Sequence, residues 1–403
     1  MSEWKTKRLG DISTINYGYT AKASFNKADS LFLRITDIQD NFVDWKTVPY
    51  CSISEIDYEK YKLIDNDIVF ARTGATTGKS YLIKKPPKSV AASYLIRLRL
   101  TDCDILPEFI AKYFQTPTYW NDISLGIVGS AQGGFNASKL SDLIIPVPPI
   151  EEQKRIVEIL DKAFEGIAQA EANTRQSLIN IRNFFKRYLD KSIHKNNSNW
   201  DRVKFQDILS QQPRNGWSPP AENHSDIGVP VLTLSSVTGF HFNIQKIKFT
   251  NAPVKVGAHY WLNNGEFLMT RSNTSELVGH VAICENITEP TICCDLIMKM
   301  SINPQWAETK FIYWYFRTSK LRHLISNSAQ GANPTMKKIN KAIVQNFPVF
   351  IPPIVEQKKI VEQIEECYQK TQKLETIYQR KLEAIAELKQ SILEKAFTGQ
   401  LSQ

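Results

Sequence analysis

The residues whose types most suggest chemistry are residues 74–80, Gly-Ala-Thr-Thr-Gly-Lys-Ser. A phosphate-binding P-loop also joins a glycine-rich turn to a lysine, but it needs four residues between its two glycines. Three residues separate Gly74 from Gly78, so the backbone amides would not form the same cradle. Three interpretations remain open: nucleotide hydrolysis at this loop, a basic loop that contacts phosphate groups, and a plain hairpin turn.

Other catalytic chemistry has little support in the sequence. A DNA methyltransferase motif would place Asn or Asp before a Pro-Pro pair, but Val147 and Ile351 precede the two pairs present. Residues 126–129 are too short to be a glycine-rich cofactor loop, and no convincing pair of nuclease carboxylates appears. The six cysteines show no Cys-x-x-Cys spacing. They predict buried free thiols in a reducing compartment, with no metal site.

Composition narrows the class of protein. The chain has 403 residues, enough for two domains or more, with 42% hydrophobic and 23% charged residues. Its formal net charge of +9 makes a polyanionic partner plausible. No apolar run approaches the roughly eighteen residues of a membrane helix, and the N-terminus lacks the apolar core of a signal peptide. We therefore expect a cytoplasmic protein.

The elements that must position these residues are organised by a repeated stretch. Residues 148–158 read Pro-Pro-Ile-Glu-Glu-Gln-Lys-Arg-Ile-Val-Glu, and residues 352–362 read Pro-Pro-Ile-Val-Glu-Gln-Lys-Lys-Ile-Val-Glu. Proline and glutamate suit the first turn of a helix, so each copy predicts a helix start. The step from Pro149 to Pro353 is 204 residues, about half the chain, which indicates duplicated domains.

The two halves of the chain also resemble each other outside the repeated Pro-Pro-Ile stretch. In the first half the patterns predict strands over 31–38 and 94–100, a strand that follows turn residues within 64–72, and a helix over 107–114. Three stretches of the second half correspond to stretches of the first. Residues 200–208 correspond to the run around Trp4, residues 311–318 to 109–116, and residues 328–331 to 130–133.

Two long helices are predicted over residues 151–195 and 355–397, because apolar residues recur there every three or four positions. Each would be a rod of about 65 Å, and Gly399 would stop the second. The predicted seams include Ile156, Leu160, Phe185 and Tyr188 in the first helix, and Ile360, Ile364, Leu374, Leu388 and Ile392 in the second.

The predicted fold is α+β. Two homologous α/β domains are joined by two long helices that form an antiparallel coiled-coil hairpin, with an approximate two-fold relation and a near-circular chain. We place the first domain at 1–147, the first helix at 148–197, the second domain at 198–351, and the second helix with the tail at 352–403.

Candidate binding residues lie where the predicted strands end. Arg72 and Arg271 occupy matching positions, and each could bind guanine or phosphate, or form a surface salt bridge. Gln132 and Gln330 could contact adenine edges or close a turn. Lys79, Lys139 and Lys337 are candidates for phosphate contacts, although exposed lysines are usually only solvated. The neighbouring loop residues complete the candidate set: Thr73, Gly74, Ser272 and Asn273.

These motifs together resemble the specificity subunits of Type I restriction–modification systems. The resemblance covers essentially the whole chain and rests on the repeated Pro-Pro-Ile stretch and on two further features. One is the pair formed by residues 67–74, Asp-Ile-Val-Phe-Ala-Arg-Thr-Gly, and 266–273, Glu-Phe-Leu-Met-Thr-Arg-Ser-Asn. The other is the tail at 396–401, Ala-Phe-Thr-Gly-Gln-Leu. The second copy has Asn273 where the first has Gly74, so contacts at that loop need not be shared.

The resemblance implies a non-catalytic DNA reader. Each globular domain would read one half of a bipartite, asymmetric site in double-stranded DNA, and the helices would set the spacing and hold two adenine methyltransferase subunits. The chain itself would bind no cofactor. S-adenosylmethionine, ATP and Mg²⁺ would belong to partner subunits, among them motor and nuclease subunits. Charged outer faces of the helices would be free for docking: Glu158, Lys162, Glu165, Glu375 and Lys381.

Two other functions remain open. The chain could be a protein-interaction scaffold without DNA recognition, or an ATP-using DNA enzyme built on the loop at Gly74.

Overall fold

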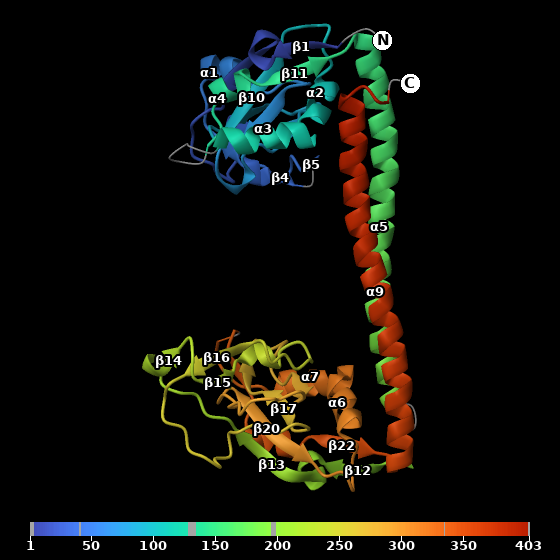
Figure 1. The fold of residues 1–403 in the computed structure, drawn as a ribbon. Helices are drawn as coiled ribbons and strands as arrows, with labels where there is room; N and C mark the ends of the chain where they lie inside the picture. Colours follow the sequence, from blue (N-terminus) through green and yellow to red (C-terminus); the bar gives the residue numbers. More distant parts are fainter. Residues whose placement is uncertain (1–3, 40–41, 128–133, 195–198, 334, 402–403) are drawn as a thin grey trace. The chain divides into compact units, whose positions relative to one another are not determined.

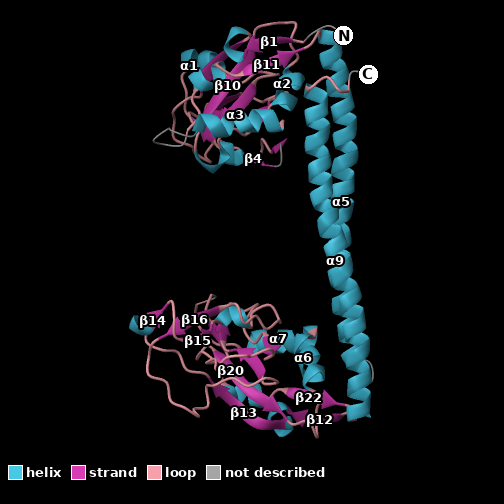
Figure 2. Cartoon of the chain, in the orientation of Figure 1, coloured by secondary structure: helices cyan, strands magenta, loops and turns pink. Residues whose placement is uncertain are grey.

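The computed structural model describes residues 4–39, 42–127, 134–194, 199–333 and 335–401. The chain divides into two compact units. Unit 1 comprises Met1–Arg175 with Gln379–Gln403, and unit 2 comprises Gln176–Tyr378. Each unit joins a mixed α/β domain to parts of two long helices (Figures 1 and 2). The prediction of two domains with mixed helix and sheet is confirmed.

The strands of unit 1 are β1 (Lys5–Arg8), β2 (Ser13–Tyr17), β3 (Ser30–Leu33), β4 (Ile38–Gln39), β5 (Phe42–Val43), β6 (Tyr50–Cys51), β7 (Ile68–Ala71), β8 (Ser80–Leu82), β9 (Ser89–Ala91), β10 (Leu95–Leu100) and β11 (Ile144–Val147). The main sheet is antiparallel, in the order β2-β10-β7-β8. A three-stranded sheet has the order β6-β3-β9, and β1-β11 and β4-β5 are strand pairs.

The short helices of unit 1 are α1 (Glu55–Tyr61), α2 (Pro107–Tyr113), α3 (Pro117–Ile127) and α4 (Ala137–Ser141), with the 3-10 helices η1 (Leu9–Asp11), η2 (Ile35–Asp37) and η3 (Gly74–Thr76). The predicted strands at 64–72 and 94–100 and the helix at 107–114 are confirmed as β7, β10 and α2. Phe70, Phe109 and Tyr119 are fully buried in the main core of this unit.

Unit 2 contains β12 (Asp201–Lys204), β13 (Leu209–Asn215), β14 (His224–Ser225), β15 (Val229–Leu232), β16 (Ile247–Thr250), β17 (Phe267–Thr270), β18 (Ser272–Asn273), β19 (Val281–Ile283), β20 (Ile297–Ile302), β21 (Lys337–Lys338), β22 (Pro348–Ile351), α6 (Thr309–Arg317), α7 (Ser319–Ser328), α8 (Lys341–Gln345) and the 3-10 helices η5 (Phe205–Ile208), η6 (Ala221–Asn223) and η7 (Leu234–Ser236). Its main sheet has the order β13-β20-β17-β19 and the smaller sheet β14-β16-β15. The main sheets of the two units therefore share one design.

One close approach of the backbone recurs in both main sheets. A Cβ atom added to Gly18 would clash with the carbonyl oxygen of Ala92, and one added to Gly216 would clash with that of Cys293. The amides of the two glycines make equivalent hydrogen bonds, to Leu95 O and Ile297 O. Glycine is therefore required at this position in each unit.

The strand predicted over residues 31–38 is wrong in its second half. The strand β3 ends at Leu33, and the 3-10 helix η2 follows. The Asp37 carboxylate accepts the Arg34 backbone N–H at 2.8 Å and pairs with the Arg34 guanidinium at 2.7 Å. This local capping interaction turns the backbone out of the strand, and alternation of side chains alone does not reveal it.

The long helices are α5 (Ile150–His194, 45 residues) and α9 (Ile354–Phe397, 44 residues), as predicted. In unit 1, Ile156 of α5 and Phe397 of α9 belong to one core. In unit 2, the rings of Phe185 and Tyr368 lie 5.1 Å apart. The start of each helix therefore pairs with the end of the other, which makes the pair antiparallel. Gly399 follows α9 with φ +74°, as a helix stop requires.

The repeated Pro-Pro-Ile stretch contains a buried glutamine that joins each long helix to its domain. Gln153 is 0% exposed; its Oε1 accepts the Leu106 N–H and its Nε2 donates to the carbonyls of Asp104 and Pro148, all at 2.8–2.9 Å. Gln357, also 0% exposed, accepts the Glu308 N–H and donates to two carbonyls in the same way. The motif is therefore a structural joint.

We expect Gln153→Leu to lower the free energy of unfolding of unit 1 by about 3 kcal/mol or more, because each buried backbone group left without a partner costs about 1–3 kcal/mol. Gln357→Leu should act in the same way on unit 2. Calorimetry of the purified chain would measure both changes. The matched control is Gln363→Leu, six residues along α9 at an exposed position. A buried variant as stable as this control would contradict the joint.

The structure describes all six cysteines. All six cysteines are free thiols; Cys51, Cys284, Cys293 and Cys294 are buried as expected, but Cys103 is exposed and Cys367 half-buried. Burial raises the pKa of Cys51 to about 11 and that of Cys284 to about 12, so both stay protonated near pH 7.

No helix among the described residues has the length and apolar character to cross a membrane.

Candidate nucleic-acid interface

Arg72 follows the last residue of β7, at the end of the main sheet of unit 1. Its backbone N–H donates to Tyr94 O at 3.2 Å, and its carbonyl accepts the Phe135 N–H at 2.9 Å. The side-chain Nε donates to Ser93 O at 3.0 Å, and the guanidinium lies 4.9 Å from the centre of the Tyr17 ring. The terminal nitrogens have no hydrogen-bond partner in the described part of the chain. Arg72 is therefore held in place with two donors available for a ligand.

Arg271 takes the same place in unit 2. Its N–H donates to Leu296 O at 2.7 Å, and its carbonyl accepts the Ile339 N–H at 3.0 Å. These two bonds repeat the backbone pattern of Arg72, so the matching positions expected from the sequence are equivalent in the structure. Neither arginine forms a salt bridge with any described residue, so the salt-bridge interpretation has no support there.

A short strand pair extends this edge of unit 2. Ser272 pairs with Lys338 and Asn273 with Lys337 across β18 and β21. Gln330 bridges to Lys338 through two backbone hydrogen bonds of 2.8 and 2.7 Å. Candidate residues from three separate stretches of sequence are thus brought together. The Ser272 side chain is only 6% exposed, so this residue contributes mainly its backbone.

The side chains along the strand pair β18–β21 differ in the hydrogen bonds that they make within the unit. Lys337 Nζ donates to Gly331 O at 2.5 Å, which fixes the lysine across its own turn. The Asn273 Nδ2 lies 3.4 Å from Thr238 Oγ1, and Asn273 Oδ1 accepts the Thr274 N–H. Gln330 is exposed. Arg271, Asn273, Gln330 and Lys337 therefore form a polar edge in unit 2, which we call the second reading edge.

The loop at residues 74–80 is a hairpin connection. The Ala71 N–H donates to Lys79 O at 2.8 Å and the Gly78 N–H to Ala71 O at 2.9 Å, which closes the turn between β7 and β8. Gly74 and Gly78 have φ of +75° and +92°. A P-loop leads from a strand into a helix, and this loop leads into another strand. The loop is therefore a hairpin without the strand-to-helix context of a nucleotide-hydrolysing loop, and its contact with phosphate stays a prediction.

The remaining candidates of unit 1 lie in different surroundings. Thr73 and Gly74 border Arg72, and Gly74 is exposed. Lys79 lines a cavity of about 550 Å³ together with Trp120 and Lys389. Lys139 Nζ donates to the Gly126 carbonyl at 2.6 Å, at the end of α3, so its charge is engaged inside the unit. Gln132 lies outside the described residues.

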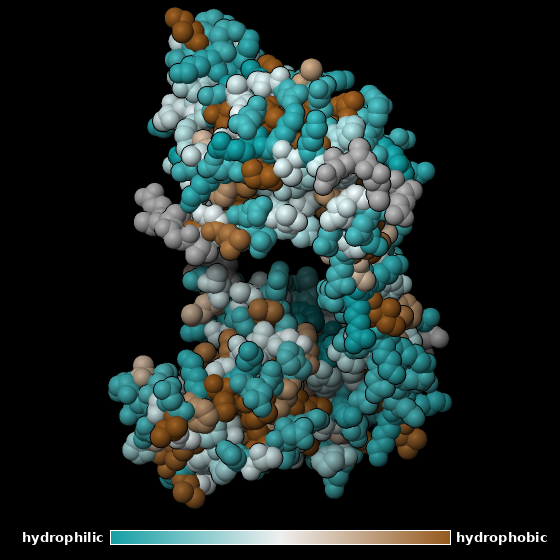
Figure 3. Space-filling model, turned by 45° about the horizontal axis from the view of Figure 1, so that its top comes forward, coloured by the Kyte–Doolittle hydropathy of each residue, from teal (hydrophilic) through white to brown (hydrophobic). Residues whose placement is uncertain are grey.

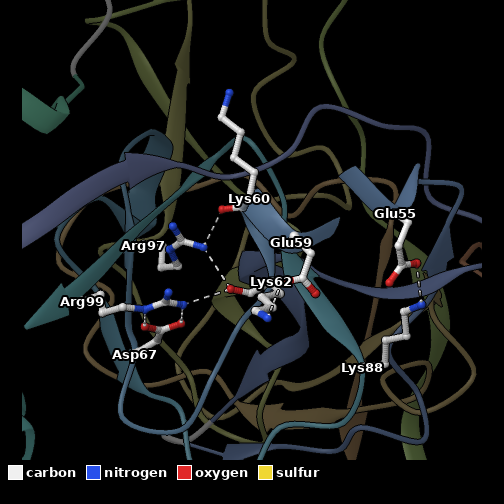
Figure 4. Close-up of polar contacts among 8 residues, drawn as sticks. All are labelled: Glu55, Glu59, Lys60, Lys62, Asp67, Lys88, Arg97 and Arg99. Carbon is white, nitrogen blue, oxygen red and sulfur yellow. Dashed lines mark hydrogen bonds and ion pairs between the residues drawn. The ribbon is translucent and has the colours of Figure 1, made fainter. Parts of the chain in front are cut away.

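A polar cluster lies at the start of β7, the strand whose other end leads into Arg72 (Figure 4). Arg99 binds the fully buried Asp67 carboxylate through Nε at 2.7 Å and Nη2 at 2.9 Å. Arg97 donates to the carbonyls of Lys60 and Lys62 at 3.1 and 2.9 Å. The hydrogen bond to Asp67 raises the pKa of Arg99, whereas burial lowers that of Arg97. Asp67 is thus a structural anion and not a catalytic one.

A similar polar cluster occurs in unit 2 with other residues. Lys299 binds Glu266 at 2.7 Å, with side chains 7% and 5% exposed, and also donates to Trp261 O. Sequence reasoning missed these pairs and the Tyr17 platform under Arg72. A usable signal was the pair of basic residues two positions apart in β10, Arg97 and Arg99, because a strand places both on one face.

The faces of the long helices differ from the expectation in two ways. Glu158, Lys162, Glu165 and Lys381 are exposed as expected, but Glu375 pairs with Arg182 at 3.4 Å. Leu374 and Leu388, predicted in the seam, are 43% and 51% exposed. Other exposed apolar side chains of these helices are Ile179, Phe184 and Ile377. Exposed apolar residues on a helix mark a surface that a partner can cover.

On the face drawn in Figure 3, hydrophobic residues are scattered among hydrophilic ones over both units. Single exposed apolar residues on the globular domains, such as Phe25 and Val256, are ordinary for a protein surface.

The chain is similar to known proteins over nearly its whole length. The family described as "Type I restriction modification DNA specificity domain" matches residues 1–179 and 197–384. The Type I restriction enzyme EcoKI specificity subunit of Escherichia coli K12 is 25% identical over 420 residues, covering 99% of this chain and 89% of the relative. The putative MjaX specificity subunit of Methanocaldococcus jannaschii is 25% identical over 422 residues, covering 99% and 94%.

Two solved structures have a similar fold. One, described as the structural basis of complex assembly and conformational transition of the type I R-M system, gives a TM-score of 0.76 at 18% identity, covering 98% of both chains. The HsdS subunit of Thermoanaerobacter tengcongensis gives 0.57 at 17% identity, covering 99% of this chain and 97% of the other.

Proposed function

Since this chain belongs to the Type I restriction–modification DNA specificity family and is a non-catalytic specificity subunit, we propose that its two units each read one half of a bipartite, asymmetric DNA site. The observation that carries the proposal is the pair Arg72 and Arg271. Both stand at the end of equivalent strands with the same backbone hydrogen bonds. Arginine binds guanine through two parallel hydrogen bonds, which makes it the commonest reader of the major groove.

The residues around each arginine would contact different parts of the DNA. In unit 2, Asn273 and Gln330 carry amides that can contact adenine, and Lys337 can contact phosphate. In unit 1, Thr73 and Gly74 would bring the backbone close to the DNA. Because the two edges carry different side chains, the two half-sites should differ in sequence, which makes the whole target asymmetric.

The long helices would dock the partner subunits and set the distance between half-sites. The exposed apolar residues Phe184, Leu374 and Ile377 would be covered by a methyltransferase subunit, with Glu158, Lys162, Glu165 and Lys381 at the rim of the interface. In this arrangement the chain binds no cofactor itself. S-adenosylmethionine would be bound by two adenine methyltransferase partners, and ATP and Mg²⁺ by motor or nuclease subunits.

We expect a gapped, two-part methylated motif when the chain is co-expressed with the methyltransferase subunit of its own system. Single-molecule sequencing of the host DNA would map every methylated adenine and give both half-sites at once. The control is the methyltransferase expressed alone, which should leave no such motif. A soluble complex that methylates no two-part motif would contradict the proposal and favour the protein-interaction scaffold.

A further inference from the structure

The second reading edge is connected to α9 through an aromatic cluster that encloses Arg317. The Arg317 guanidinium lies 4.4 Å from the Trp314 ring centre, 5.1 Å from those of Phe240 and Tyr313, and 5.2 Å from that of Tyr368. We call these five residues the Arg317 cluster. Arg317, Tyr313 and Trp314 belong to α6 and Tyr368 to α9, which lies beside α6 in unit 2 (Figure 1).

The loop that carries Phe240 depends on this cluster. Phe240 has φ +63°, a conformation that bulky residues rarely adopt. The Tyr313 hydroxyl donates to the Phe240 carbonyl at 2.5 Å and accepts a hydrogen bond from Arg317 Nη1 at 2.6 Å. A residue in such a backbone conformation persists only when its surroundings hold it. Arg317 and Tyr313 contribute to that hold, together with Arg322, whose guanidinium lies 5.4 Å from the Phe240 ring centre.

The loop that carries Phe240 borders empty space on the side of the Arg317 cluster. Phe240 also lines a cavity of about 550 Å³, together with Ile283 and Tyr368. Without the Arg317 contact, the loop would therefore have free volume to move into.

A second set of contacts leads from Phe240 to Asn273. The Phe240 ring stacks on the imidazole of His280 with centres 3.9 Å apart, and the Gly239 N–H donates to His280 Nδ1 at 3.0 Å. Burial lowers the pKa of His280 to about 4, so the ring is neutral at pH 7 and Nδ1 can accept this bond. The preceding residue, Thr238, lies 3.4 Å from the Asn273 amide through its hydroxyl.

We propose that Arg317 is a positioning residue for DNA reading by unit 2: it fixes the loop at residues 238–240 and, through Thr238, the amide of Asn273. This inference rests on the proposed function, because it takes Asn273 as a reader of the second half-site. Arg317 itself is enclosed by aromatic rings and contacts no DNA in this scheme. Its effect should therefore appear as lost selectivity at one half-site only.

Unit 1 offers a matched control because its described residues form no such cluster. The stretch 109–116 corresponds to 311–318 in sequence, and Thr116 and Thr318 make the same pair of bonds to the carbonyls of Tyr113 and Tyr315. Gln115 therefore corresponds to Arg317, and Ala111 to Tyr313. Gln115 Nε2 donates to Ala111 O within its own turn, at 3.2 Å.

The test measures methylation of duplexes that carry single base substitutions in either half-site, using the chain in complex with its methyltransferase. Arg317→Met keeps an unbranched side chain and removes the guanidinium. We expect it to raise methylation of second-half-site variants about tenfold relative to the target, a change within the range of one base contact. First-half-site selectivity should not change. Arg317→Lys should restore part of the selectivity, and Gln115→Met should behave as the unmodified chain.

Tyr313→Phe gives a second variant that removes only the bridging hydroxyl, and it should relax the same half-site to a smaller extent. Unchanged second-half-site selectivity in folded Arg317→Met and Tyr313→Phe would overturn the inference, and so would equal relaxation of both half-sites. Asn273→Ala tests the reading role of Asn273 separately from the positioning role of Arg317. If it relaxes the second half-site while the Arg317 variants do not, the positioning role is wrong and the reader stands. If it has no effect, Asn273 is not the reader and the inference falls with it.

Discussion

Replacing Arg72 with alanine should relax recognition of the first half-site and leave the second half-site as selective as before. Arg72 presents two guanidinium nitrogens that have no partner among the described residues, while Ser93 O and the Tyr17 ring hold the rest of the side chain. A bidentate contact to guanine contributes about 1–3 kcal/mol of discrimination. We therefore expect the affinity for first-half-site variants to rise about 5- to 150-fold relative to that for the target. Arg271→Ala should do the same at the second half-site.

The measurement is competition binding by the methyltransferase complex to duplexes with one substituted base each, repeated over a range of salt concentrations. Arg8→Ala is a suitable control, because Arg8 is a surface cation paired with Asp142. If Arg72→Ala weakened binding to all duplexes equally and lowered the salt slope by about 1, the arginine would contact phosphate instead. If binding were unchanged at every salt concentration, Arg72 would not be part of the DNA interface.

The duplication made much of this fold predictable from sequence. The repeated Pro-Pro-Ile stretch located the starts of α5 and α9, and the helical spacing of residues such as Ile156, Leu160 and Ile364 predicted an antiparallel helix pair. The pairing of 67–74 with 266–273 predicted that Arg72 and Arg271 occupy equivalent positions. These predictions succeeded because each rests on a pattern that is local in sequence and written twice.

The contacts that position the site could not be predicted in this way. Asp67 and Arg99 are separated by 32 residues, and Phe240 and Arg317 meet only through the packing of α6 against a loop. Strand alternation did not reveal the turn at Asp37, and helical spacing placed Leu374 and Leu388 in the seam although both are exposed. A period of three to four residues identifies the apolar side of a helix but not which edge of it a partner helix covers.

Lengthening both long helices by four residues should widen the gap between the two half-sites by about two base pairs. Four helical residues add about 6 Å, close to two DNA steps of about 3.4 Å each. The insertions must be matched, because α5 and α9 pack against each other in antiparallel fashion. Within unit 1, Lys389 lies 5.0 Å from the Phe164 ring centre. Six residues further along α5, Ala170 therefore faces the region of Glu383, and these are the two insertion points.

The readout is the methylated motif in host DNA, in which the gap and the half-sites are measured separately. An insertion after Ala170 alone is the control. It should abolish two-part methylation, because contacts such as those of Ile156 with the end of α9 and of Phe185 with Tyr368 cannot all be kept when only one helix is lengthened. The matched insertions keep the contacts at each end in register, lengthen both helices, and rotate each helix about 40° beyond one full turn. An unchanged gap in a complex that still holds its methyltransferase would show that the helices do not set the spacing. Altered half-sites would show that the domains and the helices are not independent, since the insertion points touch neither Arg72 nor Arg271.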